Sequence, residues 1–160
     1  MNELTLHLAS AKDASLIFGI RNLPESIKFS GTGQPVTENE HFVWFENLLK
    51  DKGRRLWILN DGIDDIGFVR VDLLDEAVGQ IGRVSIGIKR ESRGHNYASQ
   101  ALGLLTLQLK DMRDFYVERL RAFVHFDNIA SVKTFRKAGY AEVNTENPFV
   151  TFEILLSNES

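Results

Sequence analysis

The segment from Tyr97 to Tyr116 constrains the fold most strongly, because it is the longest part of the chain with a helical hydrophobic period. Its apolar stripe consists of Ala98, Ala101, Leu102, Leu105, Leu109 and Met112. A helix with one apolar stripe has to bury that stripe against another layer of structure. Apolar, strand-like segments at 80–88 and 120–126 flank it, so we expect a domain in which helices and strands alternate.

The other segments show shorter strand and helix patterns. Leu4, Leu6 and Leu8 alternate with polar residues, which is typical of a half-buried strand, and Thr37 with Glu40 forms a capping box that starts a helix. Together the patterns predict strands at 3–8, 55–59, 66–71, 80–88, 120–126, 141–143 and 149–156, and helices at 10–21, 37–50, 97–116 and 129–138. Four breakers predict a long connection over 22–36: Pro24, Gly31, Gly33 and Pro35.

We therefore expect one α/β (α+β) domain over residues 1–160, with about four helices beside a central, mixed and mostly antiparallel sheet. A chain of 160 residues has the usual size of one domain, and its 43% hydrophobic and 26% charged residues are near globular averages. We found no internal repeat or linker that would divide it.

Composition also narrows the class of function. The net charge of −3 disfavours nucleic acid as a partner, because that attraction depends on clustered Lys and Arg. The first ten residues, MNELTLHLAS, do not resemble a secretion signal, and no segment is apolar enough for a membrane span. The absence of cysteine fits a reducing compartment, so we expect a cytoplasmic protein without a membrane partner and without a metal.

The turn that precedes the long helix has the character of a phosphate site. Arg93-Gly-His-Asn-Tyr-Ala98 lies between an apolar strand and a helix start, where backbone N–H groups and the helix dipole attract anions. The G-x-G-x-x-G and G-K-[ST] patterns of the two best-known phosphate loops are absent. The segment therefore predicts an anion site of another kind.

A second motif follows the next strand. Asp127-Asn-Ile-Ala-Ser131 is an Asn-x-x-Ser helix entry, and Phe135-Arg-Lys-Ala-Gly-Tyr140 is a Lys-x-Gly-aromatic helix exit. With the turn at Arg93 and the order of elements, the chain resembles the GNAT superfamily of N-acetyltransferases over nearly its whole length. The resemblance implies a GNAT-type fold, acetyl-coenzyme A as the acyl donor and a small-molecule amine as the acceptor, with a homodimer as a further expectation.

The resemblance also implies roles for individual residues. The turn residues would cradle the pyrophosphate of the coenzyme, a strand edge would bond its pantetheine amides, and two polar residues would lie near its arm. The turn residues are Arg93, Gly94, His95, Asn96, Tyr97 and Ala98, the edge residues are Ser85, Ile86, Gly87 and Ile88, and the polar residues are Asn128 and Ser131.

Two positions depart from the family pattern. Asn96 stands where the family usually has Gly, and we expect it to adopt the left-handed backbone that Asn tolerates better than most residues. Phe135 stands beside the coenzyme where many members have a Tyr that protonates the leaving thiolate. Phenylalanine donates no proton, so another acid or water serves, or the thiolate leaves unassisted.

The acceptor side resembles a narrower branch. Arg21-Asn22 and the motif His41-x-x-Trp44-Phe45 recur in acetyltransferases of nucleotide-linked amino sugars, and a similar layout occurs in protein N-terminal acetyltransferases. His41 and Trp44 share a helix face and would hold a sugar or base by stacking. The alternative places Trp44 in the core and His41 on the surface.

The candidate base is His125, at the end of the strand beside the coenzyme, where a neutral imidazole can accept the amine proton. The alternative is a histidine that only packs at a strand end. Asp72, Asp75 and Glu76 are further candidates, although acidic turns are usually solvated. Three functions stay open: an amino-sugar acetyltransferase, a protein N-terminal acetyltransferase, and a non-catalytic sensor of acyl-coenzyme A.

Overall fold

The computed structural model describes residues 3–30, 32–74 and 80–156. Its strands are β1 (Thr5–Leu8), β2 (Arg54–Asn60), β3 (Asp65–Leu74), β4 (Ile81–Ile88), β5 (Arg119–His125), β6 (Ala141–Glu146) and β7 (Phe149–Leu155). Its helices are α1 (Ala14–Arg21), α2 (Pro24–Lys28), α3 (Glu38–Lys50), α4 (Tyr97–Asp111) and α5 (Ile129–Lys137), with short 3-10 turns η1 (Ala11–Asp13) and η2 (Arg90–Ser92). Every strand and helix expected from the sequence is present.

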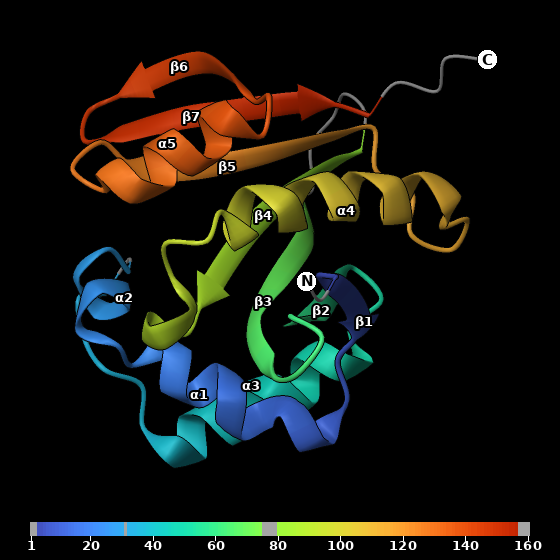
Figure 1. Ribbon diagram of the computed structural model, residues 1–160, viewed down its shortest axis with the longest axis vertical. Coiled ribbons are helices and arrows are strands. Elements are labelled where there is room, and N and C mark those ends of the chain that lie inside the picture. The colour runs from blue at the N-terminus through green and yellow to red at the C-terminus, as the bar shows by residue number, and fades with distance from the viewer. Residues whose placement is uncertain (1–2, 31, 75–79, 157–160) are drawn as a thin grey trace.

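The seven strands form one sheet in the order β1-β2-β3-β4-β5-β7-β6 (Figure 1). The pairings are antiparallel except that of β4 with β5, which is parallel. This confirms the expected mixed, mostly antiparallel sheet. Among the described residues none of the helices has the length and hydropathy that crossing a bilayer demands.

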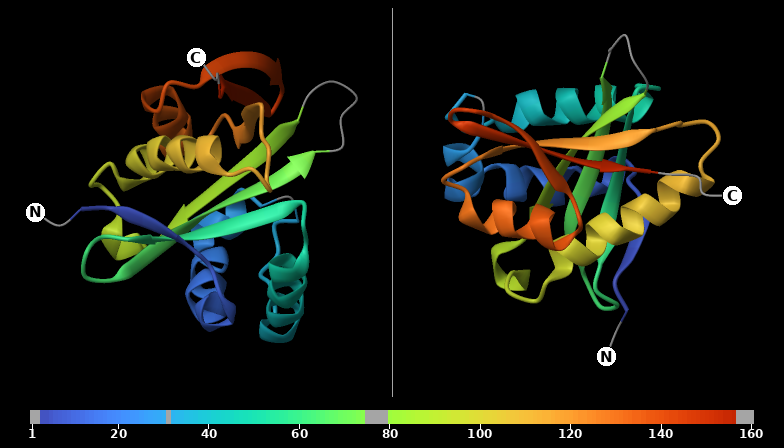
Figure 2. Two further views of the ribbon diagram at one scale, coloured as in Figure 1. Left: turned by 90° about the vertical axis from the view of Figure 1, so that its right-hand side faces the viewer. Right: turned by 90° about the horizontal axis from the view of Figure 1, so that it is seen from above.

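Helices cover both faces of the sheet, as Figure 2 shows. On one face α4 and α5 bury Leu102, Leu105 and Phe135 in the larger apolar cluster. On the other face α1 and α3 bury Ile17 and Phe45 in a smaller cluster with β2 and β3. Each buried face follows from the apolar stripe or the strand alternation of the sequence.

The structure corrects the expected elements in three places. Leu8 is 55% exposed, because it ends the edge strand β1 and no further layer covers it. The connection after Asn22 contains the extra helix α2, with Pro24 at its first turn, where proline is tolerated. The long helix ends at Asp111, because Met112 turns to an extended conformation before the buried Phe115. Gly31 and the turn around Gly79 lie outside the described residues.

Candidate functional site

The sheet opens between β4 and β5. Their pairing covers only Ile81–Arg83 with Arg119–Arg121, whereas β4 continues beside β3 as far as Ile88. Figure 1 shows the two strands diverging beyond this short overlap. In the described part of the chain, the backbone from Ser85 to Ile88 therefore has no β5 partner on its open side. An edge of this kind can pair with the amides of an extended ligand.

The turn between β4 and α4 presents backbone amides beside this edge. Gly94 has φ +86° and Asn96 has φ +62°, and α4 begins at Tyr97. The left-handed conformation expected for Asn96 is confirmed. The amides of Tyr97 and Ala98 lie in the first helical turn, which has no earlier carbonyl of the helix to accept them. The turn thus combines N–H groups that have no helical acceptor among the described residues with the positive end of a 15-residue helix.

The side chain of Arg93 ties this turn to α2. Its Nη1 donates to Glu25 Oε1 at 2.6 Å, and its Nε donates to the carbonyl oxygen of Ile88 at 3.2 Å. Arg90 also donates to Glu25, and this bond is the main cause that lowers the pKa of Glu25 to about 2. The two ion pairs hold α2 against the loop that carries the amides.

The other expected coenzyme residues lie near the start of α4 and in α5. His95 packs against Tyr97, with ring centroids 5.4 Å apart. Asn128 caps α5, since its Oδ1 accepts the N–H of Ser131 at 3.3 Å. Phe135 is 3% exposed and packs in the larger core cluster.

The residue at the tyrosine position has an aromatic neighbour with a hydroxyl. The Phe135 ring meets Tyr140 edge to face at 5.0 Å between centroids. The Tyr140 hydroxyl is buried and has no hydrogen-bond partner among the described residues. Burial also raises the pKa of Tyr140, so this hydroxyl keeps its proton at neutral pH.

On the opposite face of the sheet, His41 organises the Arg21 and Trp44 motifs. His41 is fully buried, its Nε2–H donates to the carbonyl oxygen of Ala14 at 2.7 Å, and its Nδ1 accepts from Arg21 Nη1 at 3.0 Å. Burial lowers the pKa of His41, against the raising effect of the Ala14 bond, and the charge of Arg21 lowers it further. His41 is therefore neutral, with its proton on Nε2.

His41 is fully buried, so the surface position and the stacking role expected for it are both wrong. Trp44 packs against the smaller core cluster, so its expected core position is correct in part. The Trp44 ring is half-buried at the margin of the smaller cluster, and the guanidinium carbon of Arg21 lies 4.0 Å from its centroid. His41 is interior because helix α3 turns it toward α1, where Ala14 offers an acceptor. Asn22 holds the connection after α1 by two bonds to the backbone of Val36, at 2.9 and 2.8 Å.

His125 ends β5 within a group of aromatic rings. Its ring centroid lies 5.4 Å from Phe29, 5.3 Å from Phe126 and 5.6 Å from Phe149. Its Nδ1 accepts the backbone N–H of Asp127 at 3.1 Å, so a neutral His125 carries its proton on Nε2. To act as a base, Nδ1 would have to release that amide.

Of the three further acidic candidates, the structure describes only Asp72. Asp72 lies within β3 rather than in a turn, and its carboxylate pairs with Arg70 Nη2 at 3.1 Å. Asp75 and Glu76 lie outside the described residues. Arg70 was not among the candidate site residues selected from the sequence. A charged residue within the apolar run Ile66–Val71 was the feature that could have identified it.

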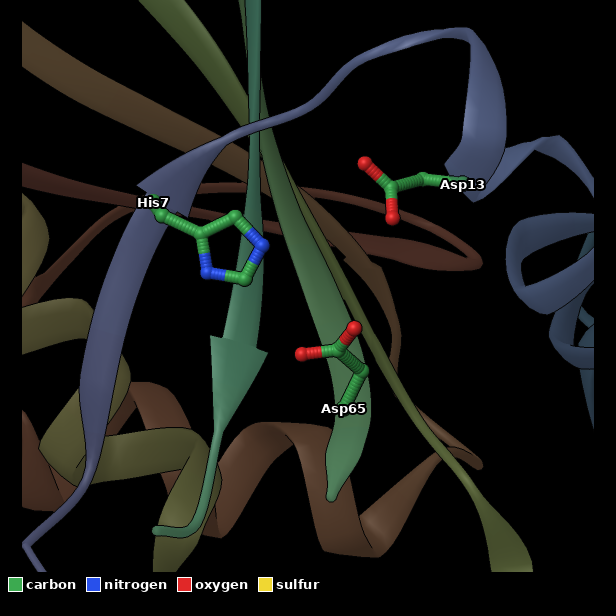
Figure 3. Close-up of side chains that lie close together, drawn as sticks. All are labelled: His7, Asp13 and Asp65. Carbon is green, nitrogen blue, oxygen red and sulfur yellow. The ribbon is translucent and has the colours of Figure 1, made fainter. Parts of the chain in front are cut away.

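One group of side chains elsewhere has the composition of a metal site. Figure 3 shows His7, Asp13 and Asp65 from β1, η1 and β3, whose ligand atoms lie within 4.8 Å of one another. Asp13 accepts the N–H of Ser10 at 2.8 Å, and Asp65 accepts from Asn60 at 2.9 Å. Because both carboxylates have structural roles in their own turns, the geometry gives no reason to place a metal here.

The amide-lined entry to α4 suits a diphosphate, and the open strand edge suits an extended arm that contains amides. Coenzyme A has both parts, so this arrangement is typical of proteins that bind coenzyme A. The acetyltransferase (GNAT) domain family model matches residues 3–141. The chain belongs to this family, so its domain is an acyltransferase domain.

A mycothiol acetyltransferase from Mycolicibacterium gilvum (strain PYR-GCK) is 32% identical over 81 residues. The match covers 51% of this chain and 27% of that protein, so the chain corresponds to only about a quarter of the relative's length.

Solved structures share the fold. Spermidine N-acetyltransferase from Vibrio cholerae in complex with CoA and spermine has a TM-score of 0.79 at 17% identity, covering 96% of this chain and 95% of that one. An aminoglycoside acetyltransferase in complex with coenzyme A and kanamycin has a TM-score of 0.76 at 13% identity, covering 96% and 95%. A putative phosphinothricin N-acetyltransferase has a TM-score of 0.73 at 24% identity, covering 98% and 100%.

The left-handed turn leads to a first testable prediction. Asn96→Gly should leave the protein intact, whereas Asn96→Val should cost about 1–2 kcal/mol, because a β-branched residue clashes at positive φ. We expect Asn96→Val to lower the melting temperature by about 2–8 °C, since about 2–4 °C per kcal/mol applies at this chain length. Thermal unfolding of both variants measures this, and equal melting temperatures would contradict the assigned conformation.

Proposed function

We propose that this chain transfers acetyl from acetyl-coenzyme A to the primary amine of a nucleotide-linked amino sugar. The observation that carries the proposal is the opening between β4 and β5, which has a different chemical character on each side. One side offers the amide-lined entry to α4, suited to a diphosphate. The other offers Arg21 and Trp44, which combine a cation with an aromatic ring, while the buried His41 accepts a hydrogen bond from Arg21.

The reaction is direct attack within a ternary complex. The amine loses a proton, its nitrogen forms a bond to the thioester carbonyl, and the carbon–sulfur bond then breaks to release thiolate. A backbone N–H of the open edge Ser85–Ile88 stabilises the tetrahedral oxyanion, as a preorganised dipole does in other acyl transfers. Holding both reactants in this opening supplies several kcal/mol of the barrier reduction, so no covalent enzyme intermediate is required.

The proton route uses the end of β5. His125 stands at the rim of the opening, 26% exposed, and we propose it as the group that accepts the amine proton, directly or through water. Acceptance at Nδ1 requires that the Asp127 amide be released on substrate binding. The thiolate leaves unassisted or takes its proton from water, because Phe135 has none to give.

The acceptor assignment rests on the side of the opening that faces α1 and α3. Trp44 offers a planar surface for a sugar or base, and Arg21 is held beside it by neutral His41. The relatives named for mycothiol and aminoglycoside acetylation, and the one bound to spermine, support a small-molecule amine as acceptor.

A thioester-consumption panel tests the proposal. We expect kcat/KM for a nucleotide-linked amino sugar to exceed that for the free amino sugar by at least about 100-fold, because hydrogen bonds to charged groups contribute roughly 1.5–3 kcal/mol each. Peptides and a polyamine complete the panel.

Two other results of this panel would each assign a different function to the chain. Higher turnover of peptides would make the chain a protein N-terminal acetyltransferase. Binding of acetyl-coenzyme A without transfer to any amine would make it a sensor, in which Phe135 marks lost catalysis.

A further inference from the structure

Arg70 of β3 is a guanidinium set deep in the acceptor side of the sheet. Its side chain is 21% exposed and pairs with Asp72 at 3.1 Å. Its guanidinium carbon lies 5.4 Å from the centroid of the Trp44 ring, which Arg21 also approaches at 4.0 Å. One aromatic ring therefore has two cations beside it.

The Arg70–Asp72 pair leaves hydrogen-bonding atoms unused. Arg70 Nε and Asp72 Oδ1 are both buried, and neither has a hydrogen-bond partner in the part of the chain that the structure describes. Nearly all buried polar atoms in native proteins are paired, and an unpaired one calls for an explanation such as a missing ligand or water.

Positive charge is in excess around this pair. Burial lowers the pKa of Arg70, against the raising effect of Asp72, and the charges of Arg54 and Arg83 lower it further. Burial also lowers the pKa of Arg21, and the charge of Arg70 adds to that effect. Arg54 is paired with Asp51 at 3.0 Å, whereas Arg83 lies over the Phe123 ring at 5.1 Å without a carboxylate partner among the described residues. Among the described residues, Asp72 is the only carboxylate that pairs with any of Arg21, Arg70 and Arg83.

The register places Arg70 beside the open edge and Arg83 at the last pair of the short overlap between β4 and β5. Arg70 pairs with Ser85 across the β3–β4 ladder, and Asp72 pairs with Arg83. Neighbouring strands lie about 4.8 Å apart, and residues paired in register share a face of the sheet. Arg70 and Arg83 thus stand on the face of Phe68, which packs under α1 and α3 and not under α4.

We infer that Arg70, together with Arg83, binds an anionic phosphate group of the acceptor; the unpaired donor Arg70 Nε and the cationic side chains of Arg70 and Arg83 support this. The inference deepens the proposed function and rests on it for the identity of the acceptor. Asp72 orients the Arg70 guanidinium. The phosphate of a nucleotide-linked sugar has the charge and the acceptor oxygens that this site lacks.

The chain offers a control in Arg55, which resembles Arg70 in exposure, in having a carboxylate partner and in lying over an aromatic ring. Its side chain is 22% exposed, pairs with Asp114 at 3.4 Å and stacks over Phe115 at 4.8 Å. It points to the opposite face of the sheet, because it is the neighbour of Leu56, whose partner across the ladder is Arg70. A purely structural arginine should therefore behave like Arg55.

The test is calorimetric binding of uridine diphosphate and of inorganic pyrophosphate with acetyl-coenzyme A saturating, so that the coenzyme's own phosphate site is filled. We expect Arg70→Gln and Arg83→Gln each to weaken binding by about 10- to 100-fold, the equivalent of one charged hydrogen bond of roughly 1.5–3 kcal/mol. Arg70→Lys should recover only part of the loss, because lysine lacks the planar fork. Arg55→Gln should bind as the wild type does.

Unchanged binding in Arg70→Gln and Arg83→Gln would overturn the inference. If Arg70→Gln does not fold, binding by Arg83→Gln still tests the inference, because Arg83 is exposed and its substitution should not disturb the core. Binding that depends on Arg70, without acetylation of any nucleotide-linked sugar, would retain the anion site and reject the proposed function. If Arg70→Gln and Arg83→Gln both acetylate such a sugar with an unchanged KM for it, the proposed function is retained and the anion site is rejected.

Discussion

Gly94→Asp is expected to lower the affinity for acetyl-coenzyme A by on the order of a thousandfold. A Cβ added at Gly94 would meet no atom within 4 Å, so the new carboxylate is accommodated without a clash in the turn that leads into α4. Two like charges about 4 Å apart cost roughly 4 kcal/mol near a protein surface, which corresponds to that loss. Calorimetric titration with acetyl-coenzyme A measures it.

Gly33→Asp is the matched control for the backbone. Gly33 has φ +67°, against +86° for Gly94, and a Cβ there also meets nothing within 4 Å. The two variants therefore carry the same new charge and comparable strain at positive φ. Gly33→Asp should bind acetyl-coenzyme A normally. Binding by Gly94→Asp within about threefold of the wild type would place the diphosphate elsewhere.

His41→Ala is expected to lower the free energy of unfolding by about 3 kcal/mol, because it opens a cavity and strips partners from buried groups. His41 is fully buried, and its loss leaves the Ala14 carbonyl and Arg21 Nη1 without their bonds. Thermal unfolding should show a drop of about 6–12 °C, from about 2–4 °C per kcal/mol. His7→Ala, at an exposed histidine of β1, should change the melting temperature little.

The lowered pKa of His41 adds a pH dependence with a definite sign. As the pH falls below 6.5, the unfolded histidine gains a proton that the folded one does not, so wild-type stability should fall until the folded pKa is reached. Glu25 changes its contribution only below its ordinary value of 4.5, which separates the two effects. Urea unfolding between pH 5 and 7 should show the fall in wild type and in His7→Ala but not in His41→Gln. An equal fall in His41→Gln would assign the titration to another group.

Most helices and strands could be predicted from the sequence because the patterns that define them involve residues close together in the chain. Thr37 accepts the N–H of Glu40 at 3.2 Å and begins α3, as the capping box predicted. The departure at Asn96 was resolved in advance by the conformational tolerance of asparagine. Such features involve residues three or four apart, so the sequence contains all the atoms that decide them.

The sequence by itself determined most of the elements, the left-handed backbone of Asn96 in the turn before α4, and the family. The tertiary structure decided which side chains meet: that His41 is interior between Ala14 and Arg21, that Trp44 has two guanidiniums beside it, and that Arg70 lies beside Ser85 with an unpaired Nε. Strand register and helix orientation set these contacts over separations of 15 to 27 residues, and burial then set their protonation. A one-residue change of register would turn Arg70 to the other face, and no local pattern in the chain encodes that choice.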